Sequence, residues 1–536
     1  MRCILSLQLI EVFLSISHHK LKSFFLLSSV VISSVNGFEL RGALDQEFGI
    51  NSLSGPACST SVQPPSLSIT SLRLSGDGTA GTYNYNFDLG VRGGGDRMRY
   101  GGTISLSNLR LQIENEKHNL TAGNVFEHFS QFSLDAPVKG ISYEYKKIHS
   151  NIENMTVVFG FDNPLWEDLF DKKSNSVRRM VAGAEVSTKW IGQTTANLSY
   201  VFTNDLTGYN DDSEFLYNTV ALDWENQSIA GLDLRGSSAF SSRSTKDSAD
   251  GSIGFAHYVS AISVDGLNRA ELEYGRVSNN FVAPVGSYLQ DRQSVKAKLR
   301  YGYSRDLSFS AAYLFYHNNL NKQLSVTTYN HKPEIGVSAS RFMGRRFATG
   351  GSSYRIDSRL SGEVKSIDHI LGVNYSDRIS VIDFGGNLDY IFARSKRDSA
   401  DNMQNRIGGN LSVSSRFVFG VMNLRPSLRY AKQYISADSS SGDGRDDISV
   451  RADIGWPGIG ISTNLVAGYN DQRRGNGSQF SKFYSNLMLN WRPEFLRQSS
   501  FYLSAGFNDI SQSSKSLSSD DDFSELLIST GFNLEF

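Results

Sequence analysis

The sequence of 536 residues has few cysteines and few prolines, with 2 Cys, 10 Pro and 5 Trp. The two cysteines, Cys3 and Cys58, are too few for a disulfide framework or a thiolate metal cage. After residue 37 no stretch approaches the roughly 18 consecutive apolar residues that a membrane-spanning helix needs. Catalytic signatures of serine hydrolases, zinc proteases and phosphate-binding loops are also missing. We therefore expect no enzyme, no catalytic residue, no cofactor and no metal site.

The chain also has no large excess of positive or negative charge. Lys and Arg number 53 and Asp and Glu number 54, which gives a formal net charge of -1. A nucleic-acid-binding chain normally carries a clear basic excess. The composition therefore argues against a nucleic-acid partner.

Glycine and aromatic residues are abundant, with 48 Gly, 33 Phe and 24 Tyr. This composition is typical of β-strands joined by tight turns. Many segments alternate apolar and polar residues with a period of two, which predicts strands with one face of each kind. Clear examples are the apolar sets Tyr83, Tyr85, Phe87, Leu89 and Val91, then Val295, Ala297, Leu299 and Tyr301, then Ile448, Val450, Ala452 and Ile454. The mean hydropathy of -0.30 is compatible with membrane strands, because only alternate residues would meet lipid.

Short polar turns and longer polar loops follow one another along the chain. The predicted short turns lie at 76–78, 115–118, 149–151, 190–193, 225–228, 264–267, 304–306, 376–378, 418–422, 456–458 and 492–498. The predicted long loops lie at 92–98, 123–138, 162–177, 204–214, 241–251, 277–292, 394–404, 435–445, 470–479 and 509–522. The first predicted strand begins at Ser66, and no turn can be placed in 342–353. This spacing predicts about 26 antiparallel strands, within roughly 22 to 28, because bacterial single-chain barrels have even strand numbers.

The chain ends on a strand whose apolar residues alternate up to the last position, in Ile528, Thr530, Phe532, Leu534 and Phe536. This ending resembles the closing strand of Gram-negative outer-membrane β-barrel proteins. The resemblance implies that Phe532, Leu534 and Phe536 form the signal read by the barrel-assembly machinery. It also implies an all-β transmembrane up-and-down barrel in outer-membrane lipid. Short turns are periplasmic in such barrels, so both termini are expected in the periplasm.

A large soluble β-sandwich array or a propeller would also show period-two strands. Neither explains the terminal aromatic residue together with two alternating classes of turn. The N-terminus adds a further indication, because Lys20 and Lys22 precede an apolar run from Phe24 to Val35. We interpret residues 1–37 as a signal peptide, with an N-terminal extension that reflects an early start codon. Residues 38–536 are then a single barrel domain.

Charged residues occupy the polar face of several predicted strands. The candidates for lining the lumen are Asp88, Arg92, Asp223, Asp233, Arg235, Glu271, Glu273, Lys296, Lys298, Arg300, Arg451 and Asp453. Glu271 and Glu273 lie one strand before Lys296 and Lys298, so cross-strand ion pairs are expected. Such rows either bias which ions pass through a lumen or simply solvate and brace the wall.

Two predicted long loops carry aromatic clusters. Residues 163–173 have the capping and charge pattern of a short helix, with an apolar face that includes Trp166 and Phe170. Phe126, Phe129 and Phe132 lie in the preceding long loop. These five aromatic residues are candidates for a constriction or lid, and rim packing is the alternative for the helix.

The size of the barrel constrains its function, because an open ring of about 26 strands would leak. The first hypothesis is a channel or porin-like passage for a large cargo, such as a polysaccharide or other exported or imported solute. Loops or a periplasmic partner would gate it. The second hypothesis is a barrel sheath or scaffold that anchors a partner protein in the lumen, without transport.

Overall fold

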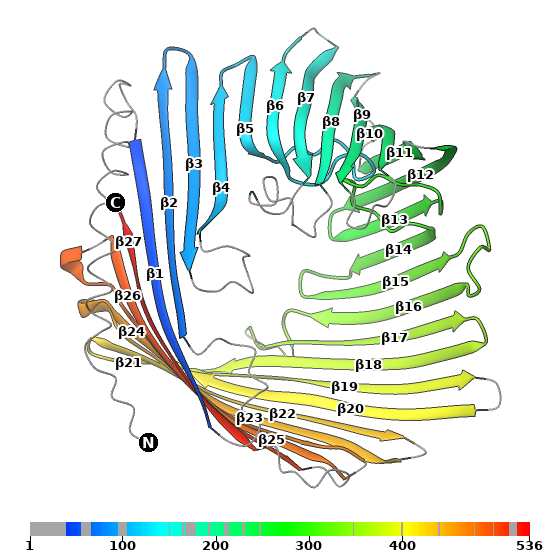
Figure 1. Ribbon diagram of the computed structural model, residues 1–536. Helices are drawn as coiled ribbons and strands as arrows, with labels where there is room; N and C mark the ends of the chain where they lie inside the picture. The colour runs from blue at the N-terminus through cyan, green and yellow to red at the C-terminus, as the bar shows by residue number, and fades with distance from the viewer. Residues whose placement is uncertain are drawn as a thin grey trace.

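Strands that alternate apolar and polar residues pair in sequence order into one antiparallel sheet that closes on itself (Figure 1). The computed structural model describes residues 39–54, 66–94, 104–148, 151–162, 166, 178–190, 193–207, 214–227, 231–245, 248–342, 344–346, 348–397, 400–437, 440–475, 477–496, 498–513 and 522–536. The predicted signal peptide, 1–37, lies outside these ranges. No helix among the described residues is long and apolar enough to cross a membrane.

The first half of the sheet contains strands of 8 to 18 residues. They are β1 (Glu39–Ser54), β2 (Ser66–Ala80), β3 (Tyr83–Gly94), β4 (Ile104–Glu114), β5 (His118–Val125), β6 (Val138–Lys146), β7 (Ile152–Asp162), β8 (Arg178–Lys189), β9 (Thr194–Thr207), β10 (Phe215–Asn226), β11 (Leu232–Thr245), β12 (Ser248–Asp265) and β13 (Asn268–Val277).

The second half contains longer strands and two short 3₁₀ turns, η4 (Pro457–Ile459) and η5 (Glu494–Leu496). The strands are β14 (Arg292–Gly302), β15 (Leu307–Asn318), β16 (Thr328–Ala339), β17 (Thr349–Ser361), β18 (Val364–Ile379), β19 (Ile382–Arg397), β20 (Ala400–Ser415), β21 (Phe417–Phe419), β22 (Met422–Ala437), β23 (Ser440–Trp456), β24 (Ile461–Arg473), β25 (Gln479–Trp491), β26 (Ser499–Ser513) and β27 (Phe523–Glu535).

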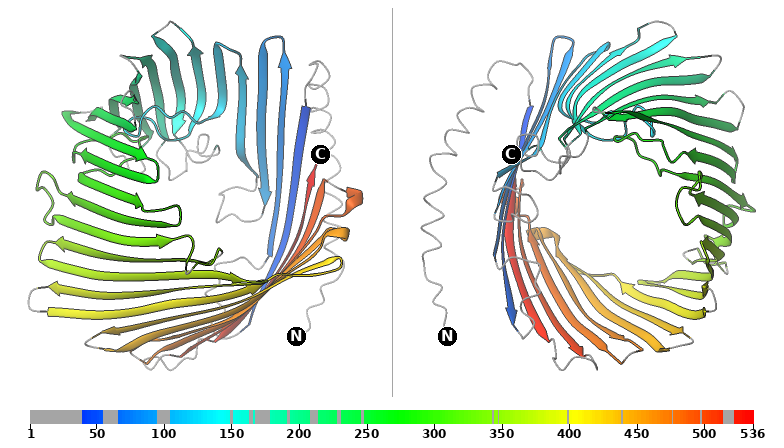
Figure 2. Two further views of the ribbon diagram at one scale, coloured as in Figure 1. Left: turned by 180° about the vertical axis from the view of Figure 1, so that it is seen from behind. Right: turned by 45° about the vertical axis from the view of Figure 1, so that its right-hand side comes forward.

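Over the described residues the closed sheet is a 26-stranded barrel, which confirms the predicted fold and strand number. β20 and β21 are separated only by Arg416 and both pair with β22, so together they form one strand of the wall. The first and last strands, β1 and β27, pair from Ala43 with Glu535 to Ser54 with Ser524. In both views of Figure 2 the ring is continuous, with β1 beside β27.

The two faces of the wall differ in polarity. Large apolar side chains such as Phe240, Ile335, Leu411 and Val450 are exposed on the outer face, at alternate positions of their strands. A water-soluble protein rarely exposes so continuous an apolar surface, whereas a bilayer requires it. The alternation read from the sequence therefore describes a lipid-facing exterior and a polar interior.

The strand β1 corrects the sequence interpretation, which placed the first strand at Ser66. Its outward positions include Gly42 and Gln46 among the apolar Leu40, Leu44 and Phe48. These two residues interrupt the apolar alternation, so the pattern does not stand out. The segment is a strand because its neighbours β2 and β27 supply hydrogen bonds along both edges.

Several predicted long loops are strand extensions rather than loops. The predicted loops 241–251, 394–404 and 435–445 fall largely within paired strands, and the turns between them are short. β23 has 17 residues, whereas a membrane crossing needs about 9–11. The polar residues that suggested loops belong to strand ends that continue beyond the length a bilayer requires. The chain also turns between Ala339 and Thr349, close to the region 342–353 where no turn could be predicted.

The last residue, Phe536, is held at the seam of the barrel. The Gly42 amide donates to the Phe536 carbonyl oxygen at 2.7 Å, and the Phe536 amide donates to the Gly42 carbonyl oxygen at 2.9 Å. A Cβ atom at position 42 would overlap the Phe536 ring. Glycine at position 42 therefore lets the terminal ring lie flat against β1.

We expect Gly42→Val to lower the yield of assembled barrel, because the new side chain displaces Phe536 from the seam. Overpacking of this kind costs about 1–3 kcal/mol. The measurement is the fraction of folded, heat-modifiable protein in outer-membrane fractions on an unboiled gel. Gly455→Val is the matched control, because a Cβ there meets open space. Equal folded fractions for the two variants would contradict this role of Gly42.

Candidate functional site: two loops that line the inside of the barrel

Two long connections fold into the ring instead of pointing away from it (Figures 1 and 2). One joins β5 to β6 and comprises residues 126–137, and the other joins β13 to β14 and comprises residues 278–291. We call these two segments the inner layer. They pack on the inner face of eight adjacent strands, β6 to β13.

The inner layer rests on small or branched apolar side chains that replace polar ones at inward positions of the wall. The first group, under Phe129, Leu134 and Val285, is Val138, Val158, Val181 and Val201. The second group, under Phe132, Phe281 and Ala283, is Ala221, Ala239, Ala256 and Val277. Each strand from β6 to β13 thus supplies one buried apolar residue to the base of the layer. Burial of this surface is the main stabilising contribution to the layer.

One inward position must have no side chain at all. Gly254 of β12 lies directly under the backbone of Phe281, so a Cβ atom there would overlap backbone atoms. The close approach fixes the depth at which the second loop sits on the wall.

Hydroxyl groups fasten the layer to the wall where polar groups become buried. The Ser130 hydroxyl donates to the Asp223 carboxylate at 2.9 Å, and the Ser133 and Ser199 hydroxyls lie 2.9 Å apart. The Val282 amide donates to the Ser241 hydroxyl oxygen at 2.8 Å. Such bonds satisfy polar groups that would otherwise be buried without partners.

The two loops also bind each other. The Asp135 amide donates to the Val285 carbonyl at 2.7 Å, and the Ser287 amide donates to the Gln131 carbonyl at 2.8 Å. Phe281 contacts Phe132 edge-on at a ring-centroid distance of 5.8 Å. The layer is therefore one packed unit, although its halves are more than 100 positions apart in the sequence.

Tyr288 closes the second loop on itself. Its ring meets Phe281 edge-on at 4.9 Å between centroids, and its hydroxyl oxygen accepts the Ala283 amide at 2.6 Å. Burial raises the pKa of the Tyr288 hydroxyl above its ordinary value.

The five predicted constriction residues have four different outcomes. Phe129 and Phe132 are each only 3% exposed in the inner layer, whereas Phe126 is 65% exposed and does not join it. Trp166 donates through its indole nitrogen to the Asn124 side-chain oxygen at 2.9 Å. Phe170 and most of the predicted helix 163–173 lie outside the described residues. Phe126, Phe129 and Phe132 thus do not form one aromatic cluster.

The twelve predicted lumen-lining residues all lie on the inner face of the wall. The pairing between neighbouring strands places each of them on the same face as the residues that contact the inner layer. The expected ion pairs are present: the Lys296 ammonium lies 2.6 Å from Glu273 and 3.1 Å from Glu271, and that of Lys298 lies 3.5 Å from Glu271. Arg235 pairs with Asp233 at 2.7 Å. Their effect on permeating ions stays a prediction.

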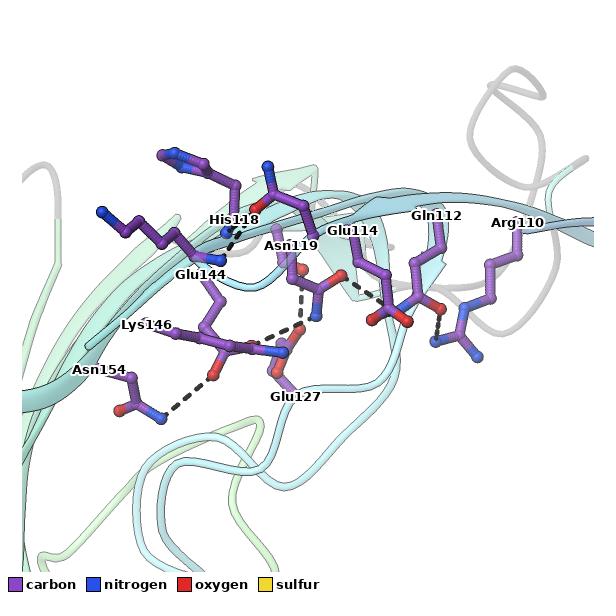
Figure 3. A network of polar contacts seen from close by, with 12 residues as sticks. Arg110, Gln112, Glu114, His118, Asn119, Glu127, Glu144, Lys146 and Asn154 are labelled. Carbon is purple, nitrogen blue, oxygen red and sulfur yellow. Dashed lines mark hydrogen bonds and ion pairs between the residues drawn. The ribbon is translucent and has the colours of Figure 1, made fainter. Parts of the chain in front are cut away.

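A second polar network, which the sequence did not single out, crosses the inner face of β4 to β7 (Figure 3). Glu144 lies at its centre and accepts hydrogen bonds from the side chains of Asn119 at 3.3 Å and Asn154 at 3.1 Å. Gln112 connects Asn119 to the next strand through a 3.0 Å bond. The network spans four strands and braces the wall beside the inner layer.

Sequence reasoning missed most of the inner layer. Val158, Ala221, Ala239 and Ala256 are apolar at positions where the strand period calls for polar residues, and this departure marks the wall under the layer. The buried Glu185 of β8 was also missed, and one of its carboxylate oxygens has no hydrogen-bond partner in the described part of the chain. Nothing in the sequence around Phe281 indicates that its loop turns inward.

A closed sheet with an apolar exterior and a charged interior settles the class of protein. The protein is a transmembrane β-barrel. No protein-family profile matches the chain, and no curated protein matches its sequence.

Among solved structures, the barrel is similar to the outer membrane transporter YddB from Escherichia coli, with a TM-score of 0.44, 8% identity, and 94% of this chain and 81% of that chain covered. It is also similar to the P pilus usher (PapC) translocation pore, with a TM-score of 0.36, 11% identity, and 92% and 99% covered. OccAB4 from Acinetobacter baumannii gives a TM-score of 0.29, 11% identity, and 94% and 99% covered.

We expect Phe281→Ala to release residues 278–291, the second segment of the inner layer, from the wall. Removing a buried Phe costs about 3–5 kcal/mol, so the population of undocked loop should rise by about 100-fold or more. The measurement is the rate of proteolytic cleavage within 278–291 in the membrane-inserted barrel. Phe126→Ala is the control, because Phe126 is exposed in the other loop. Equal cleavage rates in the two variants would show that Phe281 does not anchor the layer.

Proposed function

We propose that the barrel is a passage through the outer membrane for a large solute, narrowed on one side by the inner layer. The observation that carries this proposal is the unequal lining of the interior. The inner layer covers β6 to β13, while several strands from β14 to β23 present exposed charged side chains inward, including Arg300, Arg359 and Arg429. An exposed polar wall suits a water-filled path.

The size of the ring supports a large cargo. Barrels of 16 to 18 strands already enclose an aqueous channel, and larger ones need an obstruction. The inner layer supplies part of this obstruction. Its buried aromatic rings and hydrogen bonds to Asp223, Ser199 and Ser241 favour a fixed constriction over a mobile lid.

The orientation follows the resemblance to other barrels of this class. Tight turns at Gly81, Gly266 and Gly420 lie at the same end as the C-terminus, and this end is assigned to the periplasm. The assembly machinery would recognise Phe532, Leu534 and Phe536 from that side, and a periplasmic partner would dock there. The inner layer then enters the ring from the extracellular end.

The alternative is a sheath around a partner protein. It is favoured by the same wide interior, because a folded partner would fill the space that the inner layer leaves. A sheath needs no conducting path, so conductance separates the two functions.

We expect the purified barrel to give large, stable currents in planar lipid bilayers. The double variant Phe132→Ala, Phe281→Ala should raise the single-channel conductance or its noise, because the loops no longer hold the constriction. Phe126→Ala should leave the currents unchanged. Silent insertions accompanied by a stoichiometric co-purifying protein would refute the passage and support the sheath.

A further inference from the structure

Five arginines gather on the inner face of three adjacent wall strands. They are Arg406 on β20, Arg425 and Arg429 on β22, and Arg445 and Arg451 on β23. Register places them on one face, since Arg429 lies between Ser412 of β20 and Ser449 of β23, and Arg425 lies opposite Asp453. We call these five residues the arginine patch.

Three members of the patch form no close ion pair with a described residue, although Arg425 lies opposite Asp453. Arg425, Arg429 and Arg445 are exposed and form no ion pair with any described residue, whereas Arg451 pairs with Asp453 at 3.0 Å. Arg406 lies against the side-chain oxygen of Gln433, at 2.7 Å once that amide is oriented to accept. The patch therefore carries uncompensated positive charge.

Several other inward arginines are neutralised locally, whereas Arg300 of β14 and Arg359 of β17 form no ion pair with a described residue. Arg73 pairs with Asp88 at 2.5 Å, Arg179 with Asp205 at 2.7 Å, and Arg235 with Asp233 at 2.7 Å. Like charges on neighbouring strands destabilise a sheet. An anion bound between unpaired arginines would relieve this repulsion.

The spacing of the patch suits an extended ligand with repeated charges. Arg425 and Arg429 are four residues apart on one strand, a separation of about 13 Å at 3.3 Å per residue. Serine hydroxyls lie between the guanidinium groups, from Ser427 on the same strand and from Ser412 and Ser449 on its neighbours. Guanidinium groups bind carboxylates and sulfates in two-pronged fashion, and hydroxyls hydrogen-bond uncharged sugar hydroxyls.

The patch lies across the ring from the inner layer, as Figures 1 and 2 show for β20 to β23 and the loops after β5 and β13. On the covered side, Glu185 of β8 is buried and Asp223 of β10 is bonded to Ser130 of the inner layer, so neither carboxyl faces the space inside the ring. A solute in that space meets the free arginines on the opposite side. An anion is drawn to the patch.

We propose that the arginine patch is a binding site for an anionic polysaccharide, whose carboxylate or sulfate groups bind Arg425, Arg429 and Arg445 in turn. This deepens the proposed passage by naming its cargo class, and it rests on that function for its physiological meaning. The binding site itself is independent of whether the barrel conducts.

The test uses dextran sulfate as the probe and neutral dextran of matched size for comparison. Binding is measured on the full-length, detergent-purified barrel, so it does not require conductance. Dextran sulfate should bind and neutral dextran should not. The triple variant Arg425→Gln, Arg429→Gln, Arg445→Gln should bind about tenfold more weakly, because it lacks the three exposed charges that would contact the anion.

The control is Arg73→Gln, which removes an inward arginine that already pairs with Asp88. It should bind dextran sulfate as the unaltered barrel does. Undiminished binding by the folded triple variant, or equal loss in Arg73→Gln, would overturn the site. In bilayers, loss of anion selectivity in the triple variant adds support. A silent barrel that still binds dextran sulfate through the patch would refute the passage and leave the site standing.

Discussion

The requirement that every backbone hydrogen-bonding group be satisfied inside hydrocarbon governs this structure. A sheet meets the requirement only when it has no free edge, so the pairing of β1 with β27 determines whether the barrel exists at all. The contacts of Phe536 with Gly42 lie at this seam. The terminal aromatic residue is therefore part of the closure as well as a candidate assembly signal.

The interior shows how the same alternation is modified for function. Most inward positions are polar, but one row from Val138 to Val277 is apolar and holds the inner layer against the wall. The opposite wall keeps unpaired arginines. An apolar row under the inner layer on one side and unpaired arginines on the other thus make the two sides of the interior chemically different.

The sequence predicts the barrel well because a period of two is a local property of each strand. The apolar and polar faces of the strands at Tyr83 to Val91 and at Ile448 to Ile454 can be read from those residues alone. β1 was missed because Gly42 and Gln46 break its pattern, and its identity depends on two neighbours. The inner layer was missed because Phe132 and Phe281 meet only after eight strands bring them together. The sequence predicts several of the charged residues that face inward. It does not predict that Arg429 lacks an ion pair, because this depends on the residues of the two neighbouring strands, β20 and β23.

The central claim is that neighbouring side chains face lipid and water in turn. Single cysteines placed along β23 in a Cys58→Ser background, from Ile448 to Asp453, test it with a membrane-impermeant thiol reagent. Reaction should be fast at 449, 451 and 453 and slow at 448, 450 and 452. Uniform reactivity along the strand, or the opposite alternation, would contradict the barrel described above.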